Sequence, residues 1–432
     1  MIIANTILNN RPTDIWIKGN TIERIADHDA QLVEQAVGEE VIDGTDTAAF
    51  PSFGNAHTHA AMSLFRGFGD DLPLQEWLTT KIWPNEAHLD GEICYWGAKL
   101  ACLEMIKSGT TAFNDMYFYL PETAQAVNEM GLRATLGITG FDFFDNAKAE
   151  ELKQLYRNTE KLMAEWGCED SLIRFCAAPH AIYTVSGPTL RWISDWAREH
   201  DALYHIHLSE TEQEVTDCIN QHGLRPVQYL QQQGVVIDNR FIAAHALWLD
   251  PTEIDILGQG GATVVHNPNS NLKLGSGHAF QYTELKKAGC NVAFGTDGCS
   301  SSNNLDMVEA TKTASLLQKG WRHDTTTLPA QEALQAASRN GMKAMRINAG
   351  EIAVGMQADI LLADLRNIAF IPRHSNITNN FVYAAHGDCV KTLIGNGRVL
   401  MRDRVVPGEE EIFEQIARII QRPIEYAKEH NL

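Results

Sequence analysis

The chain has 432 residues, of which 44% are hydrophobic, and a formal net charge of −20 from 55 acidic and 35 basic side chains. This size and apolar content suit a large globular domain with an accessory domain. The acidic balance repels phosphate backbones and anionic membrane surfaces, so we expect neither a nucleic-acid nor a membrane partner.

The first 50 residues read as short strands joined by turns at Asn9–Asn10 and Gly19–Asn20. They carry no signal-peptide pattern, and no apolar run elsewhere is long enough to span a membrane. Eight scattered cysteines without a C-x-x-C pair exclude the usual structural zinc spacings and a cysteine-ligated deaminase site. We therefore expect a cytoplasmic protein with buried free thiols.

Between residues 50 and 355, eight apolar β-rich runs alternate with amphipathic helical stretches. This repeat predicts an α/β fold, the (β/α)8 TIM barrel. A doubly wound open sheet is the alternative, but no G-x-G-x-x-G fingerprint follows the first strand. The runs lie at 48–59, 109–116, 132–139, 172–181, 203–210, 239–246, 262–268 and 291–298.

The C-terminal part resembles the N-terminal part in composition. "GMQADILLADL" and "CVKTLIGNGRVLMRDRVV" read as strands, with "GNG" as a hairpin turn. We expect residues 1–50 and 356–432 to form a small composite β-sandwich with a terminal helix interrupted near Pro423. Residues 51–355 then form the barrel.

Residue types that bind metals stand at the ends of nearly all predicted barrel strands. His57 and His59, in "GNAHTH", lie two residues apart and therefore point to one face of a strand. Because barrel active sites form at the C-terminal ends of the strands, this placement predicts a metal site. The residues are His57, His59, His180, His207, Glu210, His245, His266 and Asp297.

The arrangement resembles the amidohydrolase superfamily over essentially the whole chain. The shared elements are the His-x-His after strand one, the histidines of strands five and six, "GTDG" at strand eight and "GMQADILLADL" in the returning β-domain. Longer motifs, among them "SGTTAFNDMYF", "PHAIYTVS", "HLSETEQEV" and "HNPNSNLKLGSG", look like those of the 5′-methylthioadenosine/S-adenosylhomocysteine deaminases. Related triazine hydrolases and other purine deaminases share much of this framework.

The resemblance implies one metal ion per subunit. Binuclear members of the superfamily usually carry a carboxylated lysine at the end of strand four, whereas "LIRFCAAPHA" has no lysine. We expect zinc, although iron, manganese or nickel suit the same ligand types. The implied ligands are His57, His59, His207 and Asp297.

His205 shares the strand parity of His207. We interpret His205 as a packed interior histidine, because Glu210 follows His207 in the family's His-x-x-Glu spacing.

The implied activity is hydrolytic deamination of an adenosine-type nucleoside to the inosine-type product and ammonia. A bound ion lowers the pKa of water and makes hydroxide available at neutral pH. Glu210 protonates the purine ring nitrogen and is expected to have a raised pKa in a closed site. Asp297 accepts the proton of the attacking water, and His245 orients that water.

Three further residues are candidate substrate contacts. The resemblance implies that Glu86 accepts hydrogen bonds from the ribose hydroxyls and that His180 contacts the substrate. Trp77 either walls the pocket or belongs to the core. These assignments imply a small-molecule purine nucleoside as the substrate.

One departure from the family pattern bears on the 5′ group of the substrate. Relatives that accept S-adenosylhomocysteine typically end strand three with an arginine, where this chain has Thr139 followed by Phe141, Phe143 and Phe144. A carboxylate without that partner loses about 1.5–3 kcal/mol. We therefore expect 5′-methylthioadenosine to be preferred over S-adenosylhomocysteine, unless another loop or subunit supplies the cation.

Two other functions remain open. The chain is compatible with a mononuclear amidohydrolase acting on guanine, a pterin or a triazine, and with a non-catalytic scaffold, although a scaffold should lack ligands that this chain keeps. The sequence leaves open the native metal, homo-oligomerisation, the preference among methylthioadenosine, S-adenosylhomocysteine and adenosine, and the roles of His266 and loop 267–271.

Overall fold

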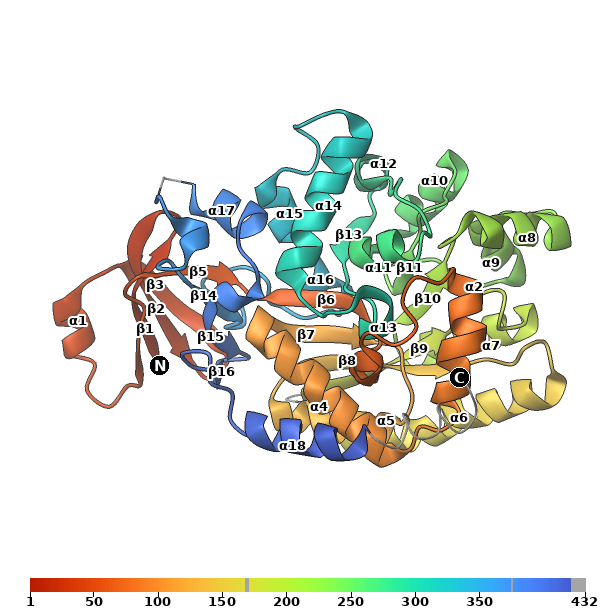
Figure 1. Ribbon diagram of the computed structural model, residues 1–432, viewed down its shortest axis with the longest axis horizontal. Helices are drawn as coiled ribbons and strands as arrows, with labels where there is room; N and C mark the ends of the chain where they lie inside the picture. The colour runs from red at the N-terminus through yellow and green to blue at the C-terminus, as the bar shows by residue number, and fades with distance from the viewer. Residues whose placement is uncertain (168–170, 374–375, 421–432) are drawn as a thin grey trace.

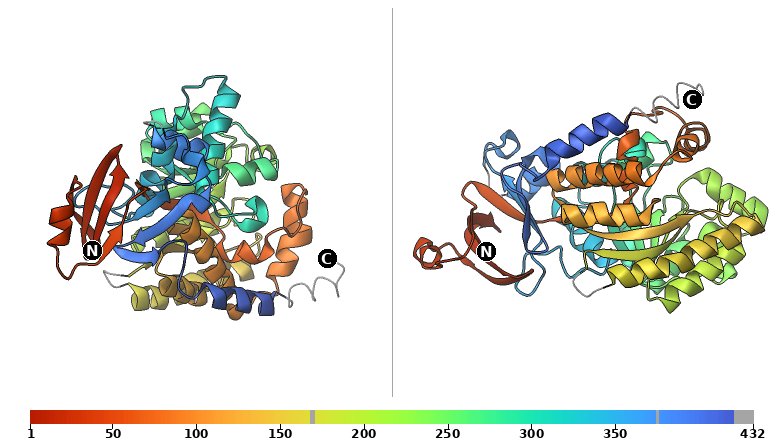
Figure 2. Two further views of the ribbon diagram at one scale, coloured as in Figure 1. Left: turned by 60° about the vertical axis from the view of Figure 1, so that its left-hand side comes forward. Right: turned by 90° about the horizontal axis from the view of Figure 1, so that it is seen from below.

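The protein is described by a computed structural model that covers residues 1–167, 171–373 and 376–420. Figure 1 shows a barrel surrounded by helices and, beside it, a β-domain that contains the N-terminus. The two further views show the same side-by-side arrangement (Figure 2).

The barrel consists of eight parallel strands that pair in chain order. This arrangement confirms the predicted barrel over the open-sheet alternative. The strands are β6 (Phe53–Thr58), β7 (Thr110–Asp115), β8 (Arg133–Gly140), β9 (Ile173–Pro179), β10 (Tyr204–Leu208), β11 (Phe241–His245), β12 (Thr263–His266) and β13 (Asn291–Phe294).

Side chains help to join the first and last barrel strands. The Asn55 amide donates to Thr296 Oγ1 at 2.7 Å, and the Thr296 backbone N–H donates to Asn55 Oδ1 at 3.1 Å. One residue further on, the Asp297 N–H donates to the His57 carbonyl at 3.1 Å. These contacts fix the ends of β6 and β13 beside each other.

The two chain ends meet in the β-domain, as predicted. Its strands form one mixed sheet in the order β16-β15-β14-β5-β1-β2-β3, with β4 beside β1. The sheet has its own apolar cluster, which includes Ile3, Ile15 and Ile360. The strands are β1 (Ile2–Leu8), β2 (Arg11–Lys18), β3 (Thr21–Asp27), β4 (Val41–Asp43), β5 (Thr47–Pro51), β14 (Ile360–Asp364), β15 (Val390–Gly395) and β16 (Arg398–Met401).

The first predicted barrel strand, 48–59, is two strands in the structure. β5 pairs with β14 in the β-domain, whereas β6 pairs with β7 in the barrel. The change occurs at Ser52, whose N–H donates to the Asp359 carbonyl at 3.1 Å, while the Phe53 N–H donates to the Gly109 carbonyl at 3.0 Å. The domain boundaries at residues 50 and 356 stay predictions.

Helices cover the outside of the barrel, and shorter helices lie within the segments that connect its strands. In the described ranges, no helix is long and apolar enough to cross a membrane. The N-terminal half contains α1 (Ala30–Glu34), η1 (Ala60–Phe65), α2 (Leu74–Trp77), η2 (Leu78–Ile82), α3 (Trp83–Glu86), α4 (Gly91–Ser108), α5 (Leu120–Met130), α6 (Asn146–Trp166) and α7 (Gly187–Glu199). The C-terminal half contains α8 (Glu212–His222), α9 (Pro226–Gln233), α10 (Pro251–Gly260), α11 (Pro268–Lys273), α12 (Tyr282–Ala288), α13 (Cys299–Ser302), α14 (Met307–Arg322), α15 (Ala330–Ala337), α16 (Arg339–Ala344), η3 (Ile368–Phe370), α17 (Ile377–Tyr383), η4 (Gly387–Cys389) and α18 (Glu409–Ile419).

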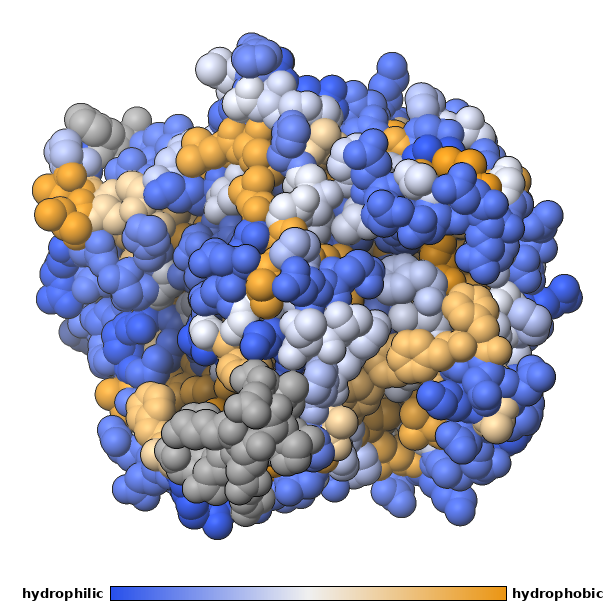
Figure 3. All heavy atoms as spheres, turned by 45° about the vertical axis from the view of Figure 1, so that its right-hand side comes forward, coloured by the Kyte–Doolittle hydropathy of each residue, from blue (hydrophilic) through white to orange (hydrophobic). Residues whose placement is uncertain are grey.

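The predicted terminal helix begins with α18, which lies along α4 (Figures 1 and 2). The predicted interruption near Pro423 lies outside the described residues. One face of the molecule is largely hydrophilic, with hydrophobic residues in several patches, one of which lies in a hollow on its right-hand half (Figure 3).

A buried ion pair links the barrel to the β-domain. Arg133, at the start of β8, donates to the carboxylate of Asp359 and to the side-chain carbonyl of Gln357. Asp359 is 1% exposed and Arg133 is 7% exposed. Removing one member of such a pair leaves the other charge buried without its partner.

We therefore predict that Arg133→Met destabilises the protein by about 3–5 kcal/mol. Chemical denaturation followed by circular dichroism measures this loss. The control is Arg366→Met, because Arg366 forms an exposed pair with Asp364 in the β-domain and its loss should leave the unfolding midpoint unchanged. Equal midpoints for both variants would contradict the prediction.

Candidate active site

Three strand ends, those of β6, β10 and β13, bring the expected metal ligands together. His57, His59 and His207 have nitrogen atoms within 4.8 Å of one another, and His57, His245 and Asp297 form a second such group. Asp297 Oδ1 lies 3.1 Å from His59 Nε2 and 3.4 Å from His57 Nε2. The residues combine the nitrogen and oxygen donors that divalent transition metals bind.

The Asp297 carboxylate is held in a fixed orientation. Its Oδ2 accepts hydrogen bonds from the Ser270 hydroxyl at 2.6 Å and the Ser301 hydroxyl at 3.0 Å, and its Oδ1 accepts from the Gly298 N–H at 2.9 Å. Asp297 also has a φ of 62°, in the left-handed region. Strained backbone of this kind is common where a functional side chain must be aimed.

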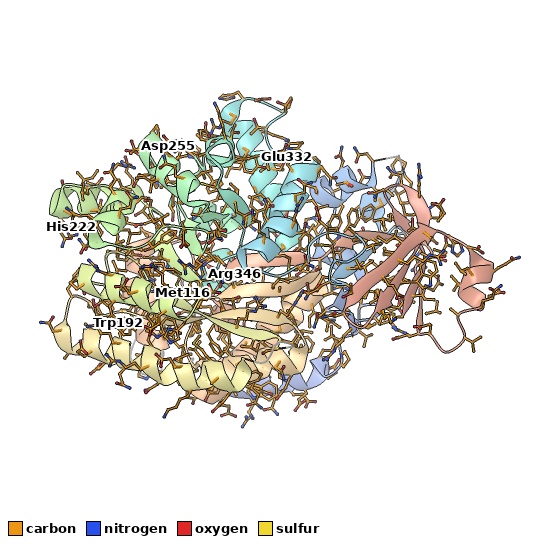
Figure 4. All side chains as sticks on the ribbon, turned by 180° about the vertical axis from the view of Figure 1, so that it is seen from behind. Met116, Trp192, His222, Asp255, Glu332 and Arg346 are labelled. Carbon is orange, nitrogen blue, oxygen red and sulfur yellow. The ribbon has the colours of Figure 1, made fainter. Side chains whose placement is uncertain are left out.

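The histidine rings are oriented through their second nitrogens. His59 Nδ1 donates to the Met116 carbonyl at 2.6 Å, and His207 Nδ1 donates to the His180 carbonyl at 2.9 Å. Met116, labelled in Figure 4, is buried within the barrel. With its proton on Nδ1, a neutral imidazole presents the lone pair of Nε2 to the common centre, as a metal ligand must. Burial acts against a charge on His59, but its hydrogen bond with Asp297 raises the pKa of His59 to about 9, so a bound ion would displace the proton of its Nε2.

The pKa shifts of His57 and Asp297 also fit a metal. Burial lowers the pKa of His57 to about 4, and its Nε2 has no hydrogen-bond partner. Burial also acts against the charge of Asp297, but its contacts with His57 and His59 hold the pKa well below its usual range. The centre therefore offers a neutral imidazole and a carboxylate at neutral pH, and the unpartnered His57 nitrogen fits a divalent ion.

His205 is buried, as predicted, but it also contacts an expected ligand. Its Nε2 lies 2.9 Å from His57 Nδ1, and its Nδ1 lies 3.1 Å from the Asn114 amide nitrogen. The same amide donates to the Ala56 carbonyl at 3.1 Å. His205 thus helps to orient the ligand His57. This role is evident from the contact between the two rings and could not be predicted from the position of His205 on its strand.

Glu210 and His245 lie on the cavity side of this centre. His245 Nε2 is 3.8 Å from Glu210 Oε2, and the Ser276 hydroxyl donates to Glu210 Oε1 at 3.0 Å. The Asn271 amide donates to His245 Nδ1 at 2.8 Å, so the ring proton of His245 lies on Nε2, toward the cavity. Burial raises the pKa of Glu210, as expected for a residue that delivers a proton.

Glu214 supports the turn that carries Glu210. Its carboxylate accepts the N–H groups of Ser209 and Glu210, each at 2.8 Å. Neither this contact nor that of Ser276 was predicted from the sequence. Glu214 lies in a helical pattern, where a glutamate is usually solvated, so the sequence gives no sign of its burial.

One cavity is lined by the candidate acid, by three of the four expected ligands and by the candidate substrate contacts. Trp77, Glu86 and His180 all line it, so Trp77 is a cavity wall as well as a buried side chain. Two further residues that line the cavity, Trp83 and Tyr117, were not predicted from the sequence. The residues that line this cavity include His59, Trp77, Trp83, Glu86, Tyr117, Phe118, Thr139, Phe141, His180, His207, Glu210, His245 and Asp297.

The aromatic segment after β8 is only partly at this cavity. Thr139 and Phe141 line it, and Phe143 lines an adjoining groove. The sequence predicts an apolar surface that includes Phe144, but Phe144 is 50% exposed and lines neither space. Phe143 and Phe144 have positive φ angles of 47° and 61°. The backbone turns here, so their side chains do not follow the alternation of a regular strand.

The Asn-rich loop borders the site, whereas His266 is packed behind it. Asn267 and Asn271 both lie within hydrogen-bond distance of His245 Nδ1, at 3.3 and 2.8 Å. The His266 ring stacks on Phe280 with centroids 4.2 Å apart, and burial lowers its pKa to about 3. His266 is therefore a buried neutral side chain beside the site.

A parallel eight-stranded barrel with histidines and an aspartate at its strand ends is the architecture of metal-dependent hydrolases. Residues 48–400 match the model of the amidohydrolase family. The chain belongs to this family.

Curated relatives are similar over nearly the whole chain. A protein of Methanoregula boonei named 5′-deoxyadenosine deaminase is 46% identical over 431 residues, which cover 99% of this chain and 96% of that protein. A protein of Archaeoglobus fulgidus named 5-methylthioadenosine/S-adenosylhomocysteine deaminase 1 is 46% identical over 388 residues, covering 90% of this chain and 89% of the relative.

Solved structures share the fold. An adenosine deaminase from Xanthomonas campestris with bound zinc superposes with a TM-score of 0.91 at 32% identity, covering 98% of both chains. An atrazine chlorohydrolase of Arthrobacter aurescens has a TM-score of 0.86 at 19% identity over 97% of this chain and 99% of the other, a likeness of fold alone.

We predict that His205→Ala weakens zinc binding by about 10–100-fold, because His57 loses the group that orients its ring. Competition with a chromophoric chelator measures the affinity, and thermal unfolding of the metal-free variant checks the fold. The exposed His323, at the end of α14, provides the control variant His323→Ala. An unchanged affinity in a folded His205→Ala protein would contradict the prediction.

Proposed function

We propose that this protein is a metal-dependent deaminase that converts adenosine-type nucleosides, 5′-methylthioadenosine and 5′-deoxyadenosine among them, to the inosine-type product and ammonia. The observation that carries the proposal is one cavity that combines a metal-ligand group, a buried glutamate with a raised pKa and a second glutamate, Glu86, further out. The names of the relatives support the same substrate class.

His57, His59, His207 and Asp297 would hold one divalent ion, for which we propose zinc. When bound, the ion supplies Lewis acidity that makes a hydroxide nucleophile available near neutral pH. The bound zinc in the Xanthomonas structure supports this identity.

The chain's own residues move the protons. Glu210, whose pKa is raised by burial, donates to the purine ring nitrogen beside the carbon that bears the amino group. His245 points its Nε2–H into the cavity and orients the attacking water. Asp297, ionised, accepts the proton that this water loses and passes it toward the leaving ammonia.

Glu86 would bind the ribose. It lies at the end of α3, on the outer side of the cavity, and a carboxylate can accept hydrogen bonds from both hydroxyls of a diol. Phe141 and Thr139 line the same region without a cation, which favours an apolar 5′ group over the amino-acid tail of S-adenosylhomocysteine.

The test is ammonia release by the zinc-loaded protein with 5′-methylthioadenosine, 5′-deoxyadenosine, adenosine, S-adenosylhomocysteine and guanine at equal concentrations. We expect the 5′-methylthio and 5′-deoxy nucleosides to give the highest kcat/KM. Turnover of guanine alone would show that the site acts on another ring, and no turnover would favour a non-catalytic protein.

We predict that Glu210→Gln lowers kcat by about 10²–10⁴-fold, because the amide cannot donate the ring proton. Metal content should stay unchanged, since Glu210 lies outside both groups of candidate ligands. Steady-state kinetics and metal analysis give the two readouts. Glu212→Gln, two residues away and exposed on α8, is the control; the same loss in this variant would refute a specific role for Glu210.

The pKa of Glu86 gives a pH prediction. Burial raises it to about 7, with Tyr117 and His59 acting in the opposite direction. Below pH 7 the carboxyl is protonated and is a weaker acceptor for the diol, so kcat/KM should fall as the pH decreases from 8 to 6.

In the variant Glu86→Gln, kcat/KM should be about 10–100-fold lower. It should also no longer fall as the pH decreases from 8 to 6. The loss should be small for a 2′,3′-dideoxy substrate, which has no diol. Glu76→Gln, exposed on α2, is the matched control. Equal losses with and without the diol would refute the ribose assignment.

A further inference from the structure

A second cavity lies at the N-terminal ends of the barrel strands, where the barrel meets the β-domain. From the barrel it is lined by Arg133 at the start of β8, by Arg174 in β9 and by Arg346 after α16 (labelled in Figure 4). From the β-domain it is lined by Asn20 and Asn396, in the turns between β2 and β3 and between β15 and β16. Among the residues that the structure describes, no aspartate or glutamate lines this cavity, although the chain has a net charge of −20.

This cavity is separate from the active site. Arg174 lies near the start of β9, and His180 follows the end of that strand, six positions further along the chain. At about 3.3 Å per residue, the two sites are about 20 Å apart. Active sites of barrels form at the C-terminal ends of the strands, so the proposed chemistry does not use the three arginines.

One of the three guanidinium groups has no carboxylate partner. Arg133 pairs with Asp359, and Arg346 Nη1 lies 3.1 Å from Asp201 Oδ2. Within the described ranges Arg174 forms no ion pair, and its Nη1 donates to the Arg346 carbonyl at 3.2 Å. Partial burial and the nearby charges of Arg133 and Arg346 lower the pKa of Arg174. The lining therefore contains one positive charge that no carboxylate balances.

The backbone holds Arg346 in a position that glycine usually occupies. The Ile347 N–H donates to the Met342 carbonyl at 2.9 Å, and the Arg346 N–H donates to the Lys343 carbonyl at 3.0 Å. This pattern ends a helix with one residue in the left-handed region, and Arg346 is that residue, with a φ of 57°. Residues other than glycine that keep such a conformation are common at functional positions, which favours a role for this guanidinium.

The lining suits the oxygens of a phosphate group. Arginine is the side chain that proteins most often use to bind phosphate, because its planar fork donates two parallel hydrogen bonds. A phosphate group carries up to two negative charges near neutral pH and has oxygens on several sides. It could therefore accept hydrogen bonds from Arg174 and from the side-chain amides of Asn20 and Asn396 at the same time, whereas a carboxylate has only two oxygens.

We infer that this cavity is a binding site for a phosphate group, carried by inorganic phosphate or by a small phosphomonoester, and that Arg174 is its principal contact. The inference does not depend on the proposed deaminase activity. A ligand that contacts both the barrel and the β-domain binds the folded chain alone, so it should raise the unfolding temperature. It should leave the active site accessible.

The experiment compares thermal unfolding of the zinc-loaded protein in inorganic phosphate, ribose 5-phosphate and acetate, with sodium chloride used to equalise the ionic strength. Isothermal titration calorimetry with the first two compounds gives the Kd. We expect a Kd on the order of 1 mM or below for at least one of them, and a higher Tm in its presence. Tighter binding of ribose 5-phosphate would identify a phosphomonoester site, and tighter binding of inorganic phosphate a site for the free ion.

The variant Arg174→Gln should bind phosphate about 10–100-fold more weakly, because it loses a charge-assisted hydrogen bond. Without phosphate its Tm should equal or exceed that of the unmodified protein, since the substitution removes a charge beside two like charges. Arg174→Lys keeps the charge without the planar fork and should retain part of the affinity. The control is Arg191→Gln, an exposed arginine on α7 that pairs with Asp195.

Equal affinity for phosphate in Arg174→Gln and in the unmodified protein would overturn the inference. Phosphate bound at the active-site metal would give this result, and it would also compete with the nucleoside substrate. Stabilisation that acetate matches at the same concentration, or no effect of either phosphate compound, would contradict the inference as well. A lower Tm of Arg174→Gln in the absence of phosphate, with unchanged binding, would show a structural role for Arg174 instead.

Discussion

The contact of Asp297 with His57 and His59 is the interaction on which the site depends. Oδ1 of the carboxylate faces both imidazoles, and Oδ2 is fixed by the hydroxyls of Ser270 and Ser301. The backbone of Asp297 in turn donates to the His57 carbonyl, where the last barrel strand meets the first. Closing the barrel therefore assembles the metal centre, because the two strands that complete the ring carry three of its four proposed ligands.

The cavity divides into a polar inner part and an apolar outer part. Burial raises the pKa of Glu210 in the inner part, while Asn271 fixes the tautomer of His245. In the outer part, Trp83 and Phe141 line the cavity beside Glu86, the residue proposed to bind the sugar. This division assigns the chemistry to the strand ends and the choice of substrate to the loops, as is usual in barrels of this kind.

The strand-end residues could be predicted because their positions follow from simple periodicity. Period-two spacing placed His57 and His59 on one face, and the barrel rule brought His207 and Asp297 to the same end. The contacts of Ser276 and Glu214 could not be predicted, because they depend on the paths of loops that no periodicity describes. The β-domain was predicted from its turns, but the change of sheet at Ser52 depends on hydrogen bonds to segments distant in the chain.

The central claim is that one metal ion binds where β6, β10 and the end of β13 meet. Anomalous diffraction from crystals of the zinc-loaded protein, with metal analysis of the same sample, tests this claim most directly. We predict one zinc ion per chain, in contact with His57, His59, His207 and Asp297. Two ions at the centre, or an ion bound by other residues, would contradict the account.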